Sequence, residues 1–149
     1  MRLRHRLRVR WSEVDAQRIV FNGNYLSYFD VGITEYWRAI GLPYPEALSD
    51  AENDLFAVRS TVNYHAPAFF DDWLDICLRA ARLGNSSMRF EFLILRGAER
   101  IASGEVVYVN AHPVERRARP LPERLRAAIL RFEGREEIGA LAGSVLTAD

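Results

Sequence analysis

The sequence predicts an α+β domain in which one long buried helix is wrapped by a curved antiparallel sheet of about five strands, followed by a C-terminal helix. Three patterns lead to this prediction: an alternating segment at residues 2–11, an apolar helical segment at residues 23–40, and four strand-like segments between residues 55 and 112. A helix that is apolar nearly all round needs cover, and a curved sheet needs its inner face filled. The chain has 149 residues, of which 49% are hydrophobic, and this is enough for one domain with a sizeable core.

Residues 2–11 form the first predicted strand, because arginine occupies every even position from 2 to 10. A period of two places these arginines on one face of a strand, which we interpret as solvated. The opposite face would carry Leu3, His5, Leu7, Val9 and Trp11.

Residues 23–40 form the predicted buried helix, with apolar side chains around most of its circumference. Gly32 lies in the middle, where glycine is less favourable than alanine by about 1 kcal/mol. We therefore expect another backbone to pass close to Gly32. Gly41, with Pro43 just beyond it, predicts the end of the helix.

Four further strands are predicted at residues 55–65, 73–83, 87–96 and 101–112, and the first places Phe56, Val58, Val62 and Tyr64 on one face. The turns between them, at residues 70–72, 84–86 and 97–100, are short, and short connections favour antiparallel neighbours in a meander. Residues 121–133 predict a closing helix with Pro122 in its first turn. The predicted domain is residues 1–133, and residues 134–149 form a tail to which no structure is assigned.

Composition limits the partners and the compartment. The 20 basic and 20 acidic residues give no net charge, so we expect neither nucleic acid nor an anionic membrane as partner. No apolar run approaches the roughly 20 residues of a membrane span, and the N-terminus lacks the apolar core of a signal peptide. Cys77 is the single cysteine, so no disulfide forms within the chain and a cytoplasmic location is expected.

Metal and cofactor sites are not expected. His5, His65 and His112 are scattered along predicted strands, and with one cysteine they make a poor ligand set, so we interpret them as structural. Cys77 is interpreted as a buried, inert thiol. No Walker, dinucleotide-binding or G-x-S-x-G pattern occurs.

Asp15 stands shortly before the predicted helix start and is the strongest catalytic candidate. A helix start offers unpaired backbone N–H groups and a partial positive charge, which can hold a carbonyl oxygen as it becomes an oxyanion. Asn22 could cap this helix, and Gly23 leaves room for a ligand. A single carboxylate without a general acid suits a thioester better than an amide, because a thiol of pKa about 8.5 leaves with little protonation. The alternative is that Asp15 only caps a turn.

Four ordered blocks resemble the 4-hydroxybenzoyl-CoA thioesterase-like family of hotdog-fold acyl-CoA thioesterases. They are VRWSEVDAQRIVFNGNYLSYFD at residues 9–30, VNYHAPAFFDDWLDI at 62–76, RLGNSSMRFEF at 82–92 and RPLPERLRAAI at 119–129. The resemblance implies a hotdog fold, hydrolysis of an acyl-CoA to free acid and CoA, and a homodimer or homotetramer. In such assemblies the sheets join edge to edge and the active site lies at the dimer interface.

The resemblance also implies roles for individual residues. Asp15 falls on the catalytic aspartate, either nucleophile or general base, and the backbone of Asn22, Gly23 and Asn24 falls on the thioester-carbonyl binder. Ser86 and Ser87 fall in a Gly-x-Ser-Ser turn near substrate or CoA. This chain departs from the family at two positions: Arg18 replaces a loop glycine, and Asn22 stands where many members have histidine.

Arginines near two of these blocks are candidates for the CoA phosphates, because guanidinium groups bind phosphate well. They are Arg82 and Arg89, which flank the Gly84–Ser87 turn, and the run Arg116, Arg117 and Arg119. For each one, the alternative is that it only solvates a loop.

Three other functions remain open at this stage. The protein could hydrolyse acyl-carrier-protein thioesters, or be a non-catalytic acyl-CoA-binding module on the same fold. A hydratase or dehydratase is less favoured, because no histidine can be placed with a second acid or base.

Overall fold

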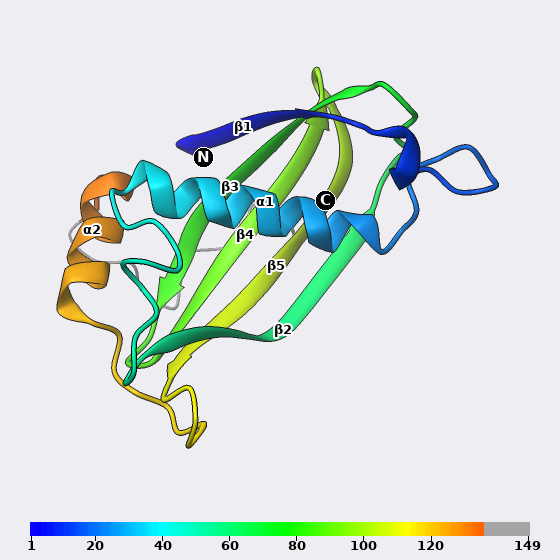
Figure 1. Ribbon diagram of the computed structural model, residues 1–149. Helices are drawn as coiled ribbons and strands as arrows, with labels where there is room; N and C mark the ends of the chain where they lie inside the picture. Colours follow the sequence, from blue (N-terminus) through cyan, green and yellow to red (C-terminus); the bar gives the residue numbers. More distant parts are fainter. Residues whose placement is uncertain (136–149) are drawn as a thin grey trace.

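The computed structural model describes residues 1–135, and its architecture confirms the predicted α+β fold. Five strands form one antiparallel sheet in the order β1-β3-β4-β5-β2, and helix α1 (Asn24–Ala39) lies against its inner face (Figure 1). The strands are β1 (Leu3–Arg8), β2 (Asp54–Tyr64), β3 (Trp73–Leu83), β4 (Ser87–Arg96) and β5 (Glu99–Ala111). A single turn of 3-10 helix, η1 (Trp11–Glu13), precedes α1, and α2 (Glu123–Glu133) closes the described chain. The tail left unassigned by the sequence lies outside the described residues, except for residues 134 and 135.

The strand order corrects part of the predicted meander. The β3, β4 and β5 strands are successive antiparallel neighbours, as predicted, but β2 pairs with β5 at the far edge and not with β3. Residues 65–72 do not make a tight turn; they cross the end of the sheet, and near their end Asp71 and Asp72 exchange backbone hydrogen bonds with Val9 (3.0 and 2.9 Å). Because β1 pairs with β3, no place beside β3 is left for β2.

Two predicted faces are also wrong in part. A β-bulge between Ala57 and Arg59 shifts the register of β2, so the side chains beyond it change faces. Val58, at the bulge, is 60% exposed, whereas Val62 and Tyr64 beyond it face the helix: Val62 packs against the core, and the Tyr64 ring meets Tyr25 of α1. At the N-terminus β1 ends at Arg8, and Trp11 in η1 is 73% exposed instead of facing the core.

Helix α1 is buried because aromatic side chains fill the space between it and the sheet. The Phe29 ring stacks on Phe92 with centroids 4.5 Å apart, and Trp37 meets Phe90 edge-on at 5.5 Å. A Cβ at Gly32 would lie 2.8 Å from Cγ2 of Ile76. The predicted close approach is therefore confirmed, but a side chain of β3 makes it and not a backbone. Gly41, at φ +80°, follows the helix end as predicted.

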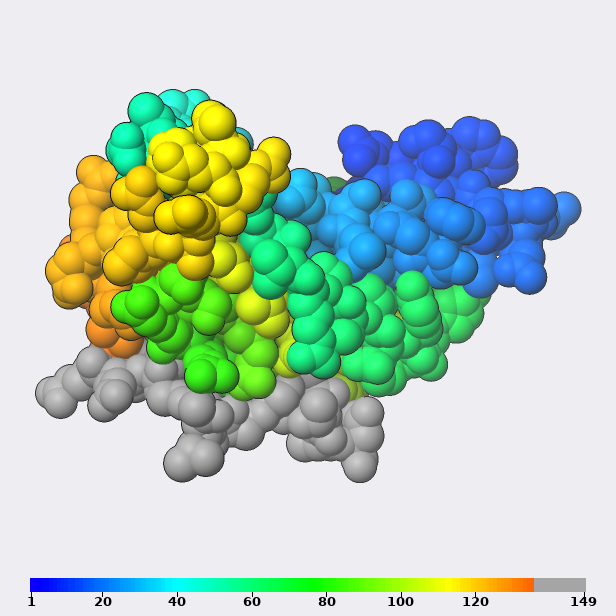
Figure 2. All heavy atoms as spheres, turned by 90° about the horizontal axis from the view of Figure 1, so that it is seen from below, coloured from blue at the N-terminus to red at the C-terminus, as the bar shows by residue number. Residues whose placement is uncertain are grey.

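The ends of α1 define the two ends of the molecule. The loop of residues 14–22 lies at the helix start, while α2 and residues 112–118 lie at the opposite end (Figures 1 and 2). The α2 side chains Leu125, Ala128 and Ile129 are buried. No helix within residues 1–135 is both long and apolar enough to cross a membrane.

Candidate active site

The loop that carries Asp15 is a tight turn closed by backbone hydrogen bonds. The N–H of Asp15 donates to the carbonyl of Ile19 (3.0 Å), and the N–H of Arg18 donates to the carbonyl of Asp15 (2.9 Å). Arg18 has φ 65°, in the left-handed region that favours glycine. The chain therefore keeps a glycine-type turn at Arg18, with an arginine in the glycine's place.

The Asp15 carboxylate uses only one of its oxygens within the described chain. Its Oδ1 accepts a hydrogen bond from the N–H of Gln17 at 2.8 Å, which is the turn-capping role considered as an alternative. Its Oδ2 accepts no hydrogen bond from residues 1–135. The side chain is half-buried, so one oxygen is anchored and the other is left for water or substrate.

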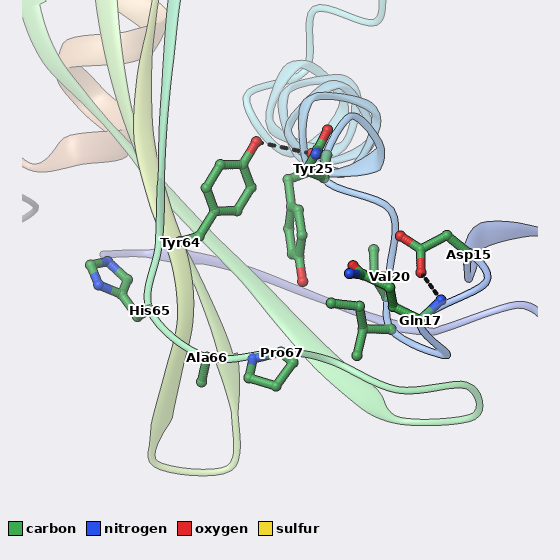
Figure 3. A pocket seen from close by; sticks show the side chains of 10 residues that line it. Asp15, Gln17, Val20, Tyr25, Tyr64, His65, Ala66 and Pro67 are labelled. Carbon is green, nitrogen blue, oxygen red and sulfur yellow. Dashed lines mark hydrogen bonds between the residues drawn. The ribbon is translucent and has the colours of Figure 1, made fainter.

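Asp15 lies between two hollows. The first is a cleft of about 410 Å³ whose labelled walls are seen in Figure 3: Gln17, Val20, Tyr25, Tyr64, His65, Ala66 and Pro67. Asn22 at the helix start also lines it. The second, of about 510 Å³, has aromatic walls formed by Trp11, Phe69 and Phe70, and Arg18 lines it as well. A thioester placed at Asp15 would therefore find room on both sides of the reacting carbon.

The helix start begins one residue later than predicted, with Gly23 and not Asn22 as the N-cap. The N–H of Asn24 donates to the carbonyl of Phe21 (2.9 Å), so this N–H already has an acceptor within the chain. In contrast, the N–H groups of Asn22 and Gly23 donate to no acceptor in residues 1–135. Gly23 has an ordinary helical φ of −67°, and a Cβ there would lie 2.9 Å from the Phe21 ring.

Two tyrosines of the cleft lie together at the helix start, and of these Tyr64 was not found from the sequence. The hydroxyl of Tyr64 donates to the carbonyl of Asn22 at 3.2 Å, and its ring meets Tyr25 edge-on with centroids 5.6 Å apart. Burial raises the pKa of the Tyr25 phenol. Tyr64 is part of the second family-like block, but it lies 42 residues from Asn22, and no local pattern could pair the two.

His65 is among the residues that line the cleft. Its ring points away from Asp15 (Figure 3), and its Nε2 lies 2.8 Å from the Oγ of Ser103, which is fully buried. This contact agrees with the structural interpretation of His65. Cys77 is buried, and no group of three His, Cys, Asp or Glu side chains in the described chain could hold a metal ion.

The structure does not bring the predicted CoA-binding residues to Asp15 within one chain. Ser86 and Ser87 lie at the turn between β3 and β4, which α2 contacts through a hydrogen bond from Arg126 to the carbonyl of Gly84 (2.6 Å). This turn is at the end of the molecule opposite the Asp15 loop (Figure 2). Arg82 is exposed, whereas Arg89 is paired with Glu105 at 3.8 Å and lies 4.0 Å from a Glu91 oxygen.

The basic run after β5 is partly engaged in structure. The Arg116 guanidinium lies over the Phe56 ring, 4.9 Å from its centroid, and Arg119 pairs with Glu52 at 3.0 Å. Arg117 is exposed, and its side chain has no partner among residues 1–135. Of the three, only Arg117 leaves its guanidinium group without a partner in residues 1–135.

Comparisons with known proteins agree with this fold. The thioesterase superfamily model matches residues 17–103 of the chain. The acyl-CoA thioester hydrolase YbgC of Escherichia coli is 29% identical over 123 residues, covering 81% of this chain and 90% of that protein. A gentisyl-coenzyme A thioesterase structure has a TM-score of 0.76 at 28% identity and covers 84% of this chain and 98% of its own.

A further structure supports the fold alone. The 1,4-dihydroxy-2-naphthoyl-CoA thioesterase from Synechocystis has a TM-score of 0.81 at 19% identity, covering 87% of this chain and 96% of its own. The hotdog architecture expected from the sequence is confirmed by this likeness. The superfamily match begins two residues after Asp15, so it does not bear on the role of that carboxylate.

Proposed function

Because the chain belongs to the thioesterase superfamily, we propose that it hydrolyses acyl-CoA thioesters to a free acid and CoA, with Asp15 as its catalytic carboxylate. One observation carries this proposal: the free Oδ2 of Asp15 shares a cleft with the helix start, where the N–H groups of Asn22 and Gly23 are unused. A nucleophile or base beside unused donors is the minimum needed to break a thioester.

In the proposed mechanism each group has a step. The thioester carbonyl oxygen accepts hydrogen bonds from the N–H groups of Asn22 and Gly23, and the positive end of the α1 dipole stabilises the oxyanion that forms there. In one route Asp15 attacks the carbonyl carbon, CoA leaves as a thiolate, and water hydrolyses the resulting anhydride. In the other route Asp15 takes a proton from water while that water attacks the carbon; the C–S bond then breaks, CoA leaves as a thiolate, and the thiolate takes the proton from Asp15. Both routes end in free acid, CoA and an ionised Asp15.

We propose that a second copy of the chain completes the site as a homodimer or homotetramer. In the described chain β2 pairs only with β5, so its outer edge is open. Open edges in soluble proteins are usually covered or protected. A partner joined along this edge could supply Ser86, Ser87 and Arg117 to the Asp15 cleft, which one chain keeps at opposite ends.

A substrate panel tests the proposed function. The protein would be assayed with benzoyl-CoA and octanoyl-CoA, with the matching acyl-pantetheines, and with the same acyl groups on a carrier protein. Faster hydrolysis of the CoA esters, measured as kcat/KM, is expected. Preference for the carrier-protein esters would assign the alternative substrate, and binding of acyl-CoA without turnover would identify a binding module.

A further inference from the structure

Glu13 lies two residues before Asp15 and accepts five hydrogen bonds through its carboxylate and its backbone carbonyl. Its Oε1 accepts from the N–H of Arg10 at 2.8 Å and from the hydroxyl of Tyr28 at 3.1 Å. Its Oε2 accepts from Nη2 of Arg10 at 2.9 Å. Glu13 is 9% exposed, whereas the Arg10 side chain that pairs with it is 76% exposed.

The backbone of Glu13 joins the same residue to the helix start. Its carbonyl accepts a hydrogen bond from the N–H of Phe21 at 2.9 Å and another from Nδ2 of Asn24 at 2.8 Å. Phe21 precedes the carbonyl-binding pair Asn22 and Gly23, and Asn24 follows that pair. Glu13 therefore holds the helix start on both sides of the two free N–H groups.

The charge on the Glu13 carboxylate strengthens the hydrogen bonds that it accepts from Arg10 and Tyr28. Burial alone would raise the pKa of its carboxyl, but the hydrogen bonds from Arg10 and Tyr28 and the Arg10 charge outweigh burial and hold the pKa below its usual range. Glu13 is thus ionised at neutral pH. Burial and the neighbouring Glu13 charge raise the pKa of Tyr28, so its hydroxyl remains a donor. Hydrogen bonds to an ionised, buried acceptor are among the stronger ones in proteins.

We propose that Glu13 is a positioning residue, which sets the distance between the Asp15 carboxylate and the N–H groups of Asn22 and Gly23. This inference rests on the catalytic role proposed for Asp15. Glu13 lines neither hollow beside Asp15; it lines a separate cavity of about 210 Å³ between β1 and α1. It therefore acts on the reaction through the placement of other groups and not by touching substrate.

The first test is Glu13→Gln, assayed with benzoyl-CoA and octanoyl-CoA. The amide keeps the shape of the side chain but removes the charge, and its NH₂ group cannot accept from Arg10. We expect kcat to fall by about tenfold or more while KM changes by about twofold or less, as for an interaction realised mainly in the transition state. A rise in KM of about tenfold with unchanged kcat would overturn the proposal.

Asp50→Asn is the matched control. Asp50 is a turn carboxylate near the start of β2, and its Oδ1 accepts from the N–H groups of Glu52 and Asn53, both at 2.8 Å. These hydrogen bonds hold its pKa below the usual range, as for Glu13. Asp50 is exposed whereas Glu13 is buried, so the control removes a hydrogen-bonded but solvated carboxylate charge at the other end of the domain, and kcat should stay unchanged. A tenfold fall in both variants would show a general loss of structure and overturn the positioning role.

A double variant separates positioning from a second catalytic role. If Glu13 sets the distance between Asp15 and the N–H groups of the helix start, the two losses should be less than additive. Adding Glu13→Gln to Asp15→Asn should then lower the residual kcat by clearly less than tenfold. A further tenfold fall in the double variant would overturn the proposal. If Asp15→Asn alone left kcat unchanged, both the catalytic role of Asp15 and the positioning role of Glu13 would fail. An inactive Asp15→Asn beside a fully active Glu13→Gln would overturn the positioning role alone.

Tyr28→Phe covers the case in which Glu13→Gln does not fold. It removes one donor to Oε1 and leaves the ring in the core, where Tyr28 is 2% exposed. We expect kcat to fall by about threefold or more with KM nearly constant. Unchanged kcat in a folded Tyr28→Phe protein would count against the proposal in the same way.

Discussion

Arg18 allows the turn around Asp15 to be tested by stability. Its φ of 65° is costly for a residue with a side chain, by roughly 1–2 kcal/mol. Glycine avoids this cost but loses about 0.5–1 kcal/mol through the greater freedom of the unfolded chain. Arg18→Gly should therefore be more stable than Arg18→Ala by about 0.5–1 kcal/mol. For 149 residues the unfolding entropy is about 300 cal/mol/K, so the expected Tm difference is about 2–3 °C.

The comparison uses thermal unfolding followed by circular dichroism on both variants. Both lack the guanidinium group, so their difference isolates the backbone from the charge. The control pair is Gln17→Gly and Gln17→Ala, because Gln17 is not among the residues of positive φ. There the sign should reverse, with alanine the more stable. If Arg18→Ala matched or exceeded Arg18→Gly in Tm, the left-handed turn at Arg18 would be wrong.

Two further predictions concern the assembly and CoA. Light scattering at micromolar concentration should give a mass at least twice the 17.1 kDa of the chain, and a fully active monomer would refute the shared site. Arg117→Ala should raise KM for acyl-CoA by roughly three- to tenfold with little change in kcat, because contacts to the nucleotide bind ground state and transition state alike. It should leave acyl-pantetheine unaffected, and an equal effect on both substrates would assign Arg117 a structural role.

The secondary structure could be predicted from the sequence because its signals are local. Arginine alternation marked β1, and the apolar circumference of residues 23–40 marked α1. The place of β2 could not be predicted in the same way. It depends on β1 taking the position beside β3, which is a contact between residues about 70 apart in the chain. The bulge in β2 likewise has no mark in the alternation of side chains.

The candidate site likewise has one part that local sequence signals predict and another that depends on contacts between distant residues. Asp15 and the helix start could be proposed together because seven residues separate Asp15 from Asn22 and because a family resemblance covers both. Glu13 was missed, since its importance comes from Tyr28 and Asn24, which reach it only in the folded chain. A carboxylate between Trp11 and Val14, three residues after Arg10, was the only local signal, and the structure pairs this buried carboxylate with the exposed side chain of Arg10.

The most direct test of the proposed mechanism is kcat of Asp15→Asn with benzoyl-CoA and octanoyl-CoA. The asparagine side-chain oxygen can still accept the hydrogen bond that Oδ1 receives from the N–H of Gln17, so the turn and the circular dichroism spectrum should be preserved. Only the free Oδ2 is replaced, by an NH₂ group that can neither attack a carbonyl nor take a proton from water. We predict that kcat falls by at least about a hundredfold, the scale of losing a positioned base. A folded Asp15→Asn protein with near-normal kcat would contradict the account.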